Sequence, residues 1–163
     1  MIVRIVKIVL AGAVAVFGFL GGIFDLINWS STVDSVTAVT SMTSWQGGAA
    51  SWKAVSSTPL SWLGAVWIVG GYLTAAALCT VTVSRMWSAR SASGAEFVAA
   101  KNLALAGCGS FAIMLFGGFT VIAEDWFELW RSNTMGGLVL NTAYRYLGSI
   151  LLIALFIAIK EPE

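Results

Sequence analysis

The sequence contains no histidine and few charged residues, and both shortages restrict what the protein can do. Its 163 residues include nine Lys or Arg and eight Asp or Glu, so only 10% of the chain is charged. Without histidine, the chain lacks the usual haem ligand, the commonest transition-metal ligand and the commonest general base at neutral pH. We therefore expect no catalytic residues, no metal site and no cofactor, and we do not expect an enzyme.

Cysteine is equally scarce, and the net charge is close to zero. The two cysteines, Cys79 and Cys108, make an incomplete zinc site in the absence of histidine. Both lie in apolar stretches, where a thiolate is costly, so we interpret them as small packing residues. The formal net charge of +1 provides no basic excess that would attract nucleic acid. The sequence therefore indicates no nucleic-acid partner and no soluble substrate.

Apolar side chains are abundant instead. They make up 58% of the chain, and the mean hydropathy is +0.87. A bilayer core about 30 Å thick needs about 20 apolar residues in a helix, and four stretches meet this length: 8–27, 61–84, 102–123 and 138–159. The first stretch is too long for the apolar core of a signal peptide, so we predict an uncleaved span. The expected fold is all-α: one polytopic membrane domain, residues 1–163, with four transmembrane helices.

The basic residues predict how these spans are oriented, because basic loops are retained in the cytoplasm. Six of them fall on one side of the predicted membrane: Arg4, Lys7, Arg85, Arg90, Lys101 and Lys160. Only Lys53 and Arg131 fall on the other side. We therefore expect both termini in the cytoplasm, in the inner membrane of a bacterium.

The outer loop between the first two spans is rich in Ser and Thr but also carries a helical apolar pattern. Its apolar residues recur at steps of three and four: Met42, Trp45, Ala49, Trp52 and Val55. Such a face would lie flat on the membrane, so we predict a short interfacial helix here. Gly47 and Gly48 weaken the pattern, and the alternative is an irregular loop anchored by two tryptophans.

Helix packing in lipid depends on small residues that let backbones approach. Three stripes of small residues are present: Gly18 and Gly22 in the first span; Gly71, Ala75 and Cys79 in the second; and Ala100, Ala104, Cys108 and Ala112 in the third. We expect Cys79 and Cys108 to lie close together between the second and third spans. The third helix should begin near residue 94, because Ser93 and Glu96 form a capping-box pattern. The Gly18 and Gly22 face and the fourth helix are the expected docking surfaces for a partner.

A polar and aromatic cluster follows the third span at the outer surface. If the helix continues, Glu124, Glu128 and Arg131 share one face, and Trp126 and Trp130 lie on another. The simplest interpretation is an interfacial segment, in which water solvates the acids and lipid headgroups take the indoles.

Arg145 lies inside the fourth span, near this cluster. The apolar stretch that follows it, residues 146–159, is 14 residues long, or about 21 Å, and cannot cross the core alone. Arg145 should therefore enter the outer leaflet. There it would pair with an acid, preferably Glu124 or Asp125 and next Asp25, or it would extend to the surface without a partner.

Three segments of this sequence resemble a known bacterial family. They are FVAAK (97–101), FGGFTVIAEDWFELWRS (116–132) and AYRY (143–146). The chain is similar over nearly its whole length to the predicted small integral membrane proteins called domain of unknown function 2165. The resemblance implies a four-helix membrane protein of unassigned activity, and it assigns no catalytic residues.

Three functions fit these observations. The first is a non-catalytic accessory or assembly subunit of a respiratory or photosynthetic complex, with membrane lipids and other integral membrane subunits as partners. The second is a lipid- or quinone-binding protein that uses Arg145, Tyr144, Trp126 and Glu124 as an outer-leaflet pocket. The third is a small transporter component, which is disfavoured because the middle of each predicted span holds no ionisable residue.

Overall fold

The computed structural model describes residues 1–160, and within that range the chain forms helices and no strand. Four helical segments are long and apolar enough to cross a membrane. They are α1 (Ile2–Ile27), α3 (Thr58–Ser88), α4 with its continuation η2 (Gly94–Ile113 and Met114–Trp126), and α5 (Gly136–Ala158). The predicted all-α fold with four spans is confirmed.

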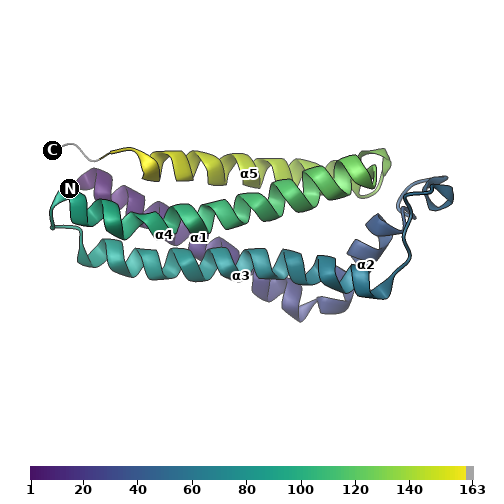
Figure 1. Ribbon diagram of the computed structural model, residues 1–163, viewed down its shortest axis with the longest axis horizontal. Helices are drawn as coiled ribbons and strands as arrows, with labels where there is room; N and C mark the ends of the chain where they lie inside the picture. Colours follow the sequence, from purple (N-terminus) through teal and green to yellow (C-terminus); the bar gives the residue numbers. More distant parts are fainter. Residues whose placement is uncertain (161–163) are drawn as a thin grey trace.

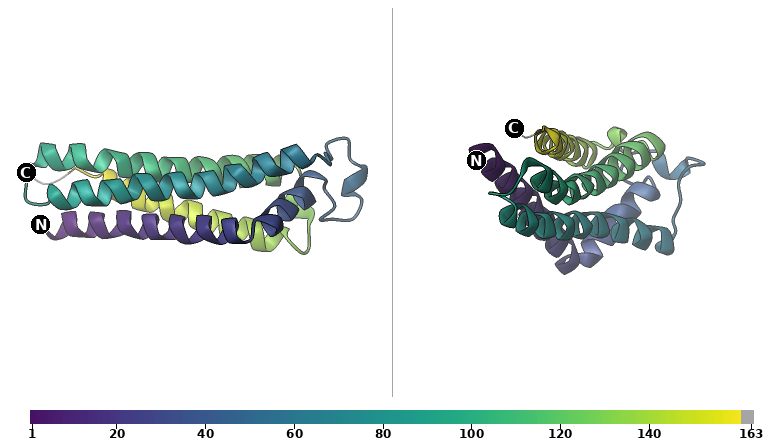
Figure 2. Two further views of the ribbon diagram at one scale, coloured as in Figure 1. Left: turned by 90° about the horizontal axis from the view of Figure 1, so that it is seen from below. Right: turned by 60° about the vertical axis from the view of Figure 1, so that its left-hand side comes forward.

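The four spans form an elongated bundle (Figure 1). One end of the bundle holds the start of α1, the end of α5 and the turn between α3 and α4, and we call it the inner end. Both views of Figure 2 show the same arrangement. The loops that follow α2 and η2 lie at the opposite, outer end. At 31 residues, α3 is about 46 Å long, so it must tilt or extend beyond a bilayer core about 30 Å thick.

α1 packs against α3 through the predicted glycine face. A Cβ atom added at Gly18 would lie 2.7 Å from the carbonyl oxygen of Tyr72, and one at Gly22 would lie 2.7 Å from the Leu73 side chain. Only glycine therefore allows the two backbones to come this close. The predicted helix contact is confirmed, but the expectation that this face docks a partner is wrong, because α3 already covers it.

The other two stripes of small residues pack α3 against α4 and η2. Gly71 lies against the Met114 side chain, and Ala104 is fully buried. Cys79 and Cys108 are both free thiols, both buried, and lie beside each other in the main core cluster. Their predicted proximity and their packing role are consistent with this arrangement.

The helix in the first outer loop lies upstream of the predicted one. α2 spans Trp29–Thr40, whereas the stretch from Met42 to Val55 contains turns and one short 3-10 segment, η1 (Gly48–Ala50). The predicted helix is wrong because Met42 and Gly47 both take positive φ, 53° and 87°, which turns the chain back on itself. Met42 is consequently buried inside the loop instead of lying on a membrane-facing stripe.

Basic residues tie the inner end together. Lys7 and Lys101 are buried, and each donates a hydrogen bond to the Ile159 carbonyl oxygen, at 2.6 and 2.8 Å. These bonds satisfy carbonyl groups that a helix C-terminus leaves without intrahelical partners. At the neighbouring turn, the predicted capping box of Ser93 and Glu96 is present. The inner half of the bundle is therefore closely tied from α1 to α5.

Candidate functional site

One aromatic ring from each of the four spanning segments meets in the middle of the bundle. Phe17 of α1 lies 4.7 Å from Tyr146 of α5 and 5.5 Å from Phe111 of α4, measured between ring centroids. Tyr72 of α3 lies 5.1 Å from Phe111. We call these four residues the aromatic floor, because a cavity begins directly above them.

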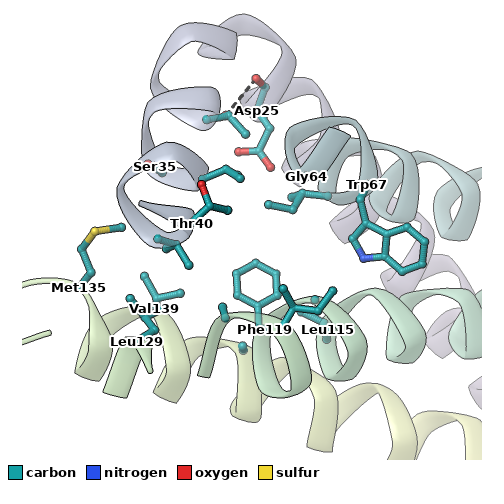
Figure 3. A pocket seen from close by; sticks show the side chains of 18 of the residues that line it. Asp25, Ser35, Thr40, Gly64, Trp67, Leu115, Phe119, Leu129, Met135 and Val139 are labelled. Carbon is teal, nitrogen blue, oxygen red and sulfur yellow. Dashed lines mark hydrogen bonds between the residues drawn. The ribbon is translucent and has the colours of Figure 1, made fainter. Parts of the chain in front are cut away.

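The cavity occupies the outer half of the bundle and has a volume of about 710 Å³. Residues from α1, α2, α3, η2 and α5 line it, including Tyr72 and Tyr146 of the aromatic floor. Figure 3 shows Trp67, Leu115, Phe119 and Val139 arranged around the open space. Its volume falls in the range of about 300 to 1,000 Å³ that ligand pockets occupy, and its wall is mostly apolar.

The η2 segment forms one wall of this cavity with an unusually wide helical turn. Its backbone hydrogen bonds follow the π-helical pattern. The same pattern extends one residue beyond the segment, where the Phe127 amide donates to the Ile122 carbonyl at 3.0 Å. Gly117 and Gly118 favour departure from the α-helix, and π-helical turns are rare and frequent at functional sites. The segment contributes Leu115, Phe119 and Ile122 to the lining.

One charged side chain faces the cavity. Asp25, near the outer end of α1, is half-buried and directs its carboxylate toward the open space (Figure 3). It is the only charged residue among the lining residues, and no ion pair joins it to any residue of the described range. Around it, α2 and α5 contribute hydroxyl groups from Thr32, Ser35 and Thr142.

Part of the cavity wall lies at the apolar surface of the bundle. Several apolar lining residues are strongly exposed, among them Phe24, Leu63 and Leu138 at 67%, 66% and 74%. In a membrane these side chains would contact acyl chains. A hydrophobic molecule could therefore enter from the bilayer without crossing water.

The outer end of the cavity is closed by apolar packing and by two loops tied to each other. Leu129 and Leu140 form a small core cluster there, with Val39 of α2 packed against it. Ser132 donates a hydrogen bond to the Ser44 carbonyl at 2.8 Å, which joins the loop after η2 to the loop after α2.

Glu128 is the centre of the electrostatic contact between these loops. Its carboxylate accepts from Lys53 Nζ and from Arg131 Nη1, each at 2.9 Å. These two hydrogen bonds hold the pKa of Glu128 below its ordinary value. The Arg131 guanidinium also lies over the Trp45 ring, 4.0 Å from its centroid. The polar cluster of this segment thus links two loops.

The predicted helical face of Glu124, Glu128 and Arg131 is wrong. The helix ends at Trp126, Glu128 takes a positive φ of 54°, and a 3-10 turn, η3 (Leu129–Arg131), follows. Trp126 instead forms an edge contact with Trp52 of the first loop, while Trp130 is 63% exposed. After the helix ends, Leu129 of η3 is buried in a cluster with Ala123 and Leu140.

The prediction that Arg145 is buried against an acid is also wrong. Arg145 is exposed, and within residues 1–160 it contacts the Thr142 hydroxyl at 3.5 Å and forms no ion pair with Glu124, Asp125 or Asp25. The residue before it, Tyr144, donates a hydrogen bond to Glu124 instead. A shift of one residue on α5 turns the side chain by about 100°, which directs Arg145 away from the acid.

Sequence reasoning identified only part of this site. None of the four residues proposed for an outer pocket, Glu124, Trp126, Tyr144 and Arg145, lines the cavity. Asp25, which was predicted only as a possible partner of Arg145, does line it. The aromatic lining residues Trp67, Phe119 and Tyr146 were missed, because each lies in an apolar run that fits lipid contact equally well. Within the described residues, no group of three or more His, Cys, Asp or Glu could hold a metal ion.

Comparison with known proteins identifies one related group. The family model described as "predicted small integral membrane protein (DUF2165)" matches residues 3–160. No curated protein and no solved structure matches the chain.

Replacing Glu128 with Gln should reduce thermal stability in a pH-dependent way. Because the folded-state pKa of Glu128 is lowered, its contribution is complete above the ordinary glutamate value of 4.5 and disappears as the pH falls through the lowered value. We expect a small decrease in the unfolding temperature at neutral pH, since the ion pairs are partly exposed. The difference between wild type and Glu128→Gln should vanish in acid, measured by thermal unfolding in detergent.

Asp125→Asn is the matched control, because Asp125 is exposed, lies three residues away and has no ion pair within residues 1–160. An equal loss of stability in both variants at neutral pH would contradict a specific role for Glu128.

Proposed function

Since the chain belongs to this family of predicted small integral membrane proteins, we propose that it acts within the membrane as a non-catalytic binding protein for one lipid-like amphiphile. The observation that carries this proposal is the cavity of about 710 Å³, whose lining includes apolar residues that are exposed at the bundle surface. A polar group near Asp25 and an apolar wall of Leu115, Phe119 and Val139 together suit a molecule with a head and a hydrophobic tail.

The arrangement of the bundle supports binding more than passage. The aromatic floor closes the cavity toward the inner end, and Leu129 with its neighbours closes it toward the outer end. A molecule that entered from the bilayer would therefore have to leave by the same side. This supports a binding role over a channel role. The lipid- or quinone-binding function predicted from the sequence is therefore retained as a proposal, but with different lining residues.

A second candidate function is an accessory or assembly subunit of a larger inner-membrane complex. The observation that favours it is Arg145, an exposed cation in the outer half of a spanning helix with no ion pair within the described residues. A charge inside a membrane costs at least about 2.5 kcal/mol at the helix centre, so an acidic side chain of a neighbouring subunit would stabilise it. α5 presents apolar residues on the same exposed side, including Leu152 and Leu155.

The orientation predicted from the basic residues belongs to this proposal. With both termini in the cytoplasm, the cavity would open in the outer leaflet and Lys53 and Arg131 would face the outer surface. The concentration of Arg and Lys at the inner end of the bundle, where α1 begins and α5 ends, supports this orientation.

Amphiphile binding is tested with a long-chain alcohol that carries a photoreactive diazirine in its tail. In wild-type protein, irradiation should label peptides that contain cavity residues such as Phe119. Val139→Trp should reduce this labelling at least about tenfold, because the indole fills the space that the tail occupies. The control is Leu152→Trp, a position on the same helix that is 69% exposed and does not line the cavity, which should label like wild type. Equal labelling of all three proteins would overturn the proposal.

The subunit role is tested by crosslinking in native membranes followed by mild extraction and size separation. Wild type should migrate with a partner, and Arg145→Gln should lose most of that species. Arg131→Gln should keep it, because Arg131 pairs with Glu128 inside the chain. Migration of the wild type as a free monomer after crosslinking would exclude this role.

Orientation is tested with an impermeant thiol reagent on intact cells. In a variant with Cys79 and Cys108 replaced by Ala, Ser35→Cys should react and Ser91→Cys should not, and both positions are exposed. Labelling of Ser91→Cys alone would reverse the orientation.

A further inference from the structure

The charge inside the cavity has one sign. Among the residues that line it, Asp25 is the single acid, and there is no lysine and no arginine. A carboxylate in a spanning helix is costly unless a cation or several hydrogen-bond donors face it. The Thr32 hydroxyl is directed to the backbone carbonyl of Asp25, at 3.3 Å, and not to the carboxylate. The carboxylate therefore faces the cavity as an acceptor.

The basic residues nearest in the outer half of the bundle are engaged elsewhere. Lys53 and Arg131 both contact Glu128 in the outer loops. Arg145 contacts Thr142 at the rim, is exposed, and does not line the cavity. Within residues 1–160, no cation of the chain therefore neutralises Asp25.

Aromatic rings complete the environment that this acid creates. Trp67, Tyr72, Phe119 and Tyr146 line the same cavity, from three different spanning segments. The faces of aromatic rings carry negative electrostatic potential, and they attract ammonium groups within about 6 Å of the ring centroid. Tyr72 and Tyr146 line the cavity together with Asp25, which places these groups in one region. The Asp25 carboxylate and the surrounding aromatic rings would together attract a positively charged group.

We propose that the amphiphile bound in this cavity carries a positively charged amine head, which the Asp25 carboxylate holds. This inference rests on the proposed amphiphile-binding function. Asp25 lies eight residues beyond Phe17 on α1, or about 12 Å above the aromatic floor, so the head lies near the outer end of the span. The tail then packs along Leu115, Phe119 and Val139. An anionic head would meet the carboxylate and no compensating cation.

The experiment compares three diazirine probes with the same tail and different heads: a primary amine, an alcohol and a carboxylic acid. Labelling is measured at neutral pH on the full-length protein in micelles of an uncharged detergent, so that no anionic surface concentrates the amine. We expect the amine to label cavity peptides at about tenfold lower concentration than the alcohol, and the acid to label them least. Asp25→Asn should reduce labelling by the amine about tenfold and leave labelling by the alcohol unchanged.

Asp34→Asn is the matched control, because Asp34 is an exposed acid on α2 that does not line the cavity, and it should behave like wild type. If the alcohol labels the cavity as well as the amine does, or if the acid labels it best, the proposed head group is wrong and amphiphile binding still stands. If none of the three probes labels the cavity, amphiphile binding itself fails. The wild-type comparison decides the question even where Asp25→Asn does not fold.

Discussion

The close contact between α1 and α3 at Gly18 and Gly22 is the constraint on which the rest of the structure depends. In lipid, apolar side chains gain little by leaving one apolar environment for another, so helices associate through close packing. Here a Cβ atom at Gly18 would lie 2.7 Å from the Tyr72 carbonyl oxygen. This contact fixes α1 against α3 and brings Phe17 into the middle of the bundle, where it meets a ring from each of the other spans. The aromatic floor and the cavity above it both follow from this placement.

The two ends of the bundle are held by different chemistry. At the inner end, buried Lys7 and Lys101 donate to the Ile159 carbonyl just after α5, and Arg4 donates to the carbonyls of Arg90 and Ala92 at 3.0 and 2.7 Å. At the outer end, Glu128 and Ser132 join two loops that carry little regular structure. Backbone groups inside a bilayer must be satisfied within the protein, whereas loops outside it are free to adopt irregular turns. The cavity lies in the outer half, next to these loops.

The two candidate functions use different faces of the same outer half. The cavity lies between α1, α2, α3, η2 and α5, while Arg145 is exposed at its rim and contacts Thr142, which lines it. A subunit docked on α5 would therefore lie beside the bound amphiphile. Amphiphile binding depends on the Asp25 carboxylate and the volume near Val139, whereas docking depends on Arg145, so the two roles separate by residue.

The sequence by itself determined the number of spans, the all-α class, the capping of α4 by Ser93 and the small-residue stripes, because each follows from local composition or from spacing along one helix. It also placed Asp25 and Arg145 in the outer half. The tertiary structure alone decided which of them faces inward, since a single residue step rotates a side chain by about 100° and sequence does not fix the rotation of α5 against its neighbours. It likewise decided that Gly18 and Gly22 face α3 instead of a partner, that Met42 folds into a compact loop, and that Trp67, Tyr72, Phe119 and Tyr146 surround one cavity. Four apolar helices can pack in several arrangements with similar surface patterns, and only the three-dimensional contacts select one.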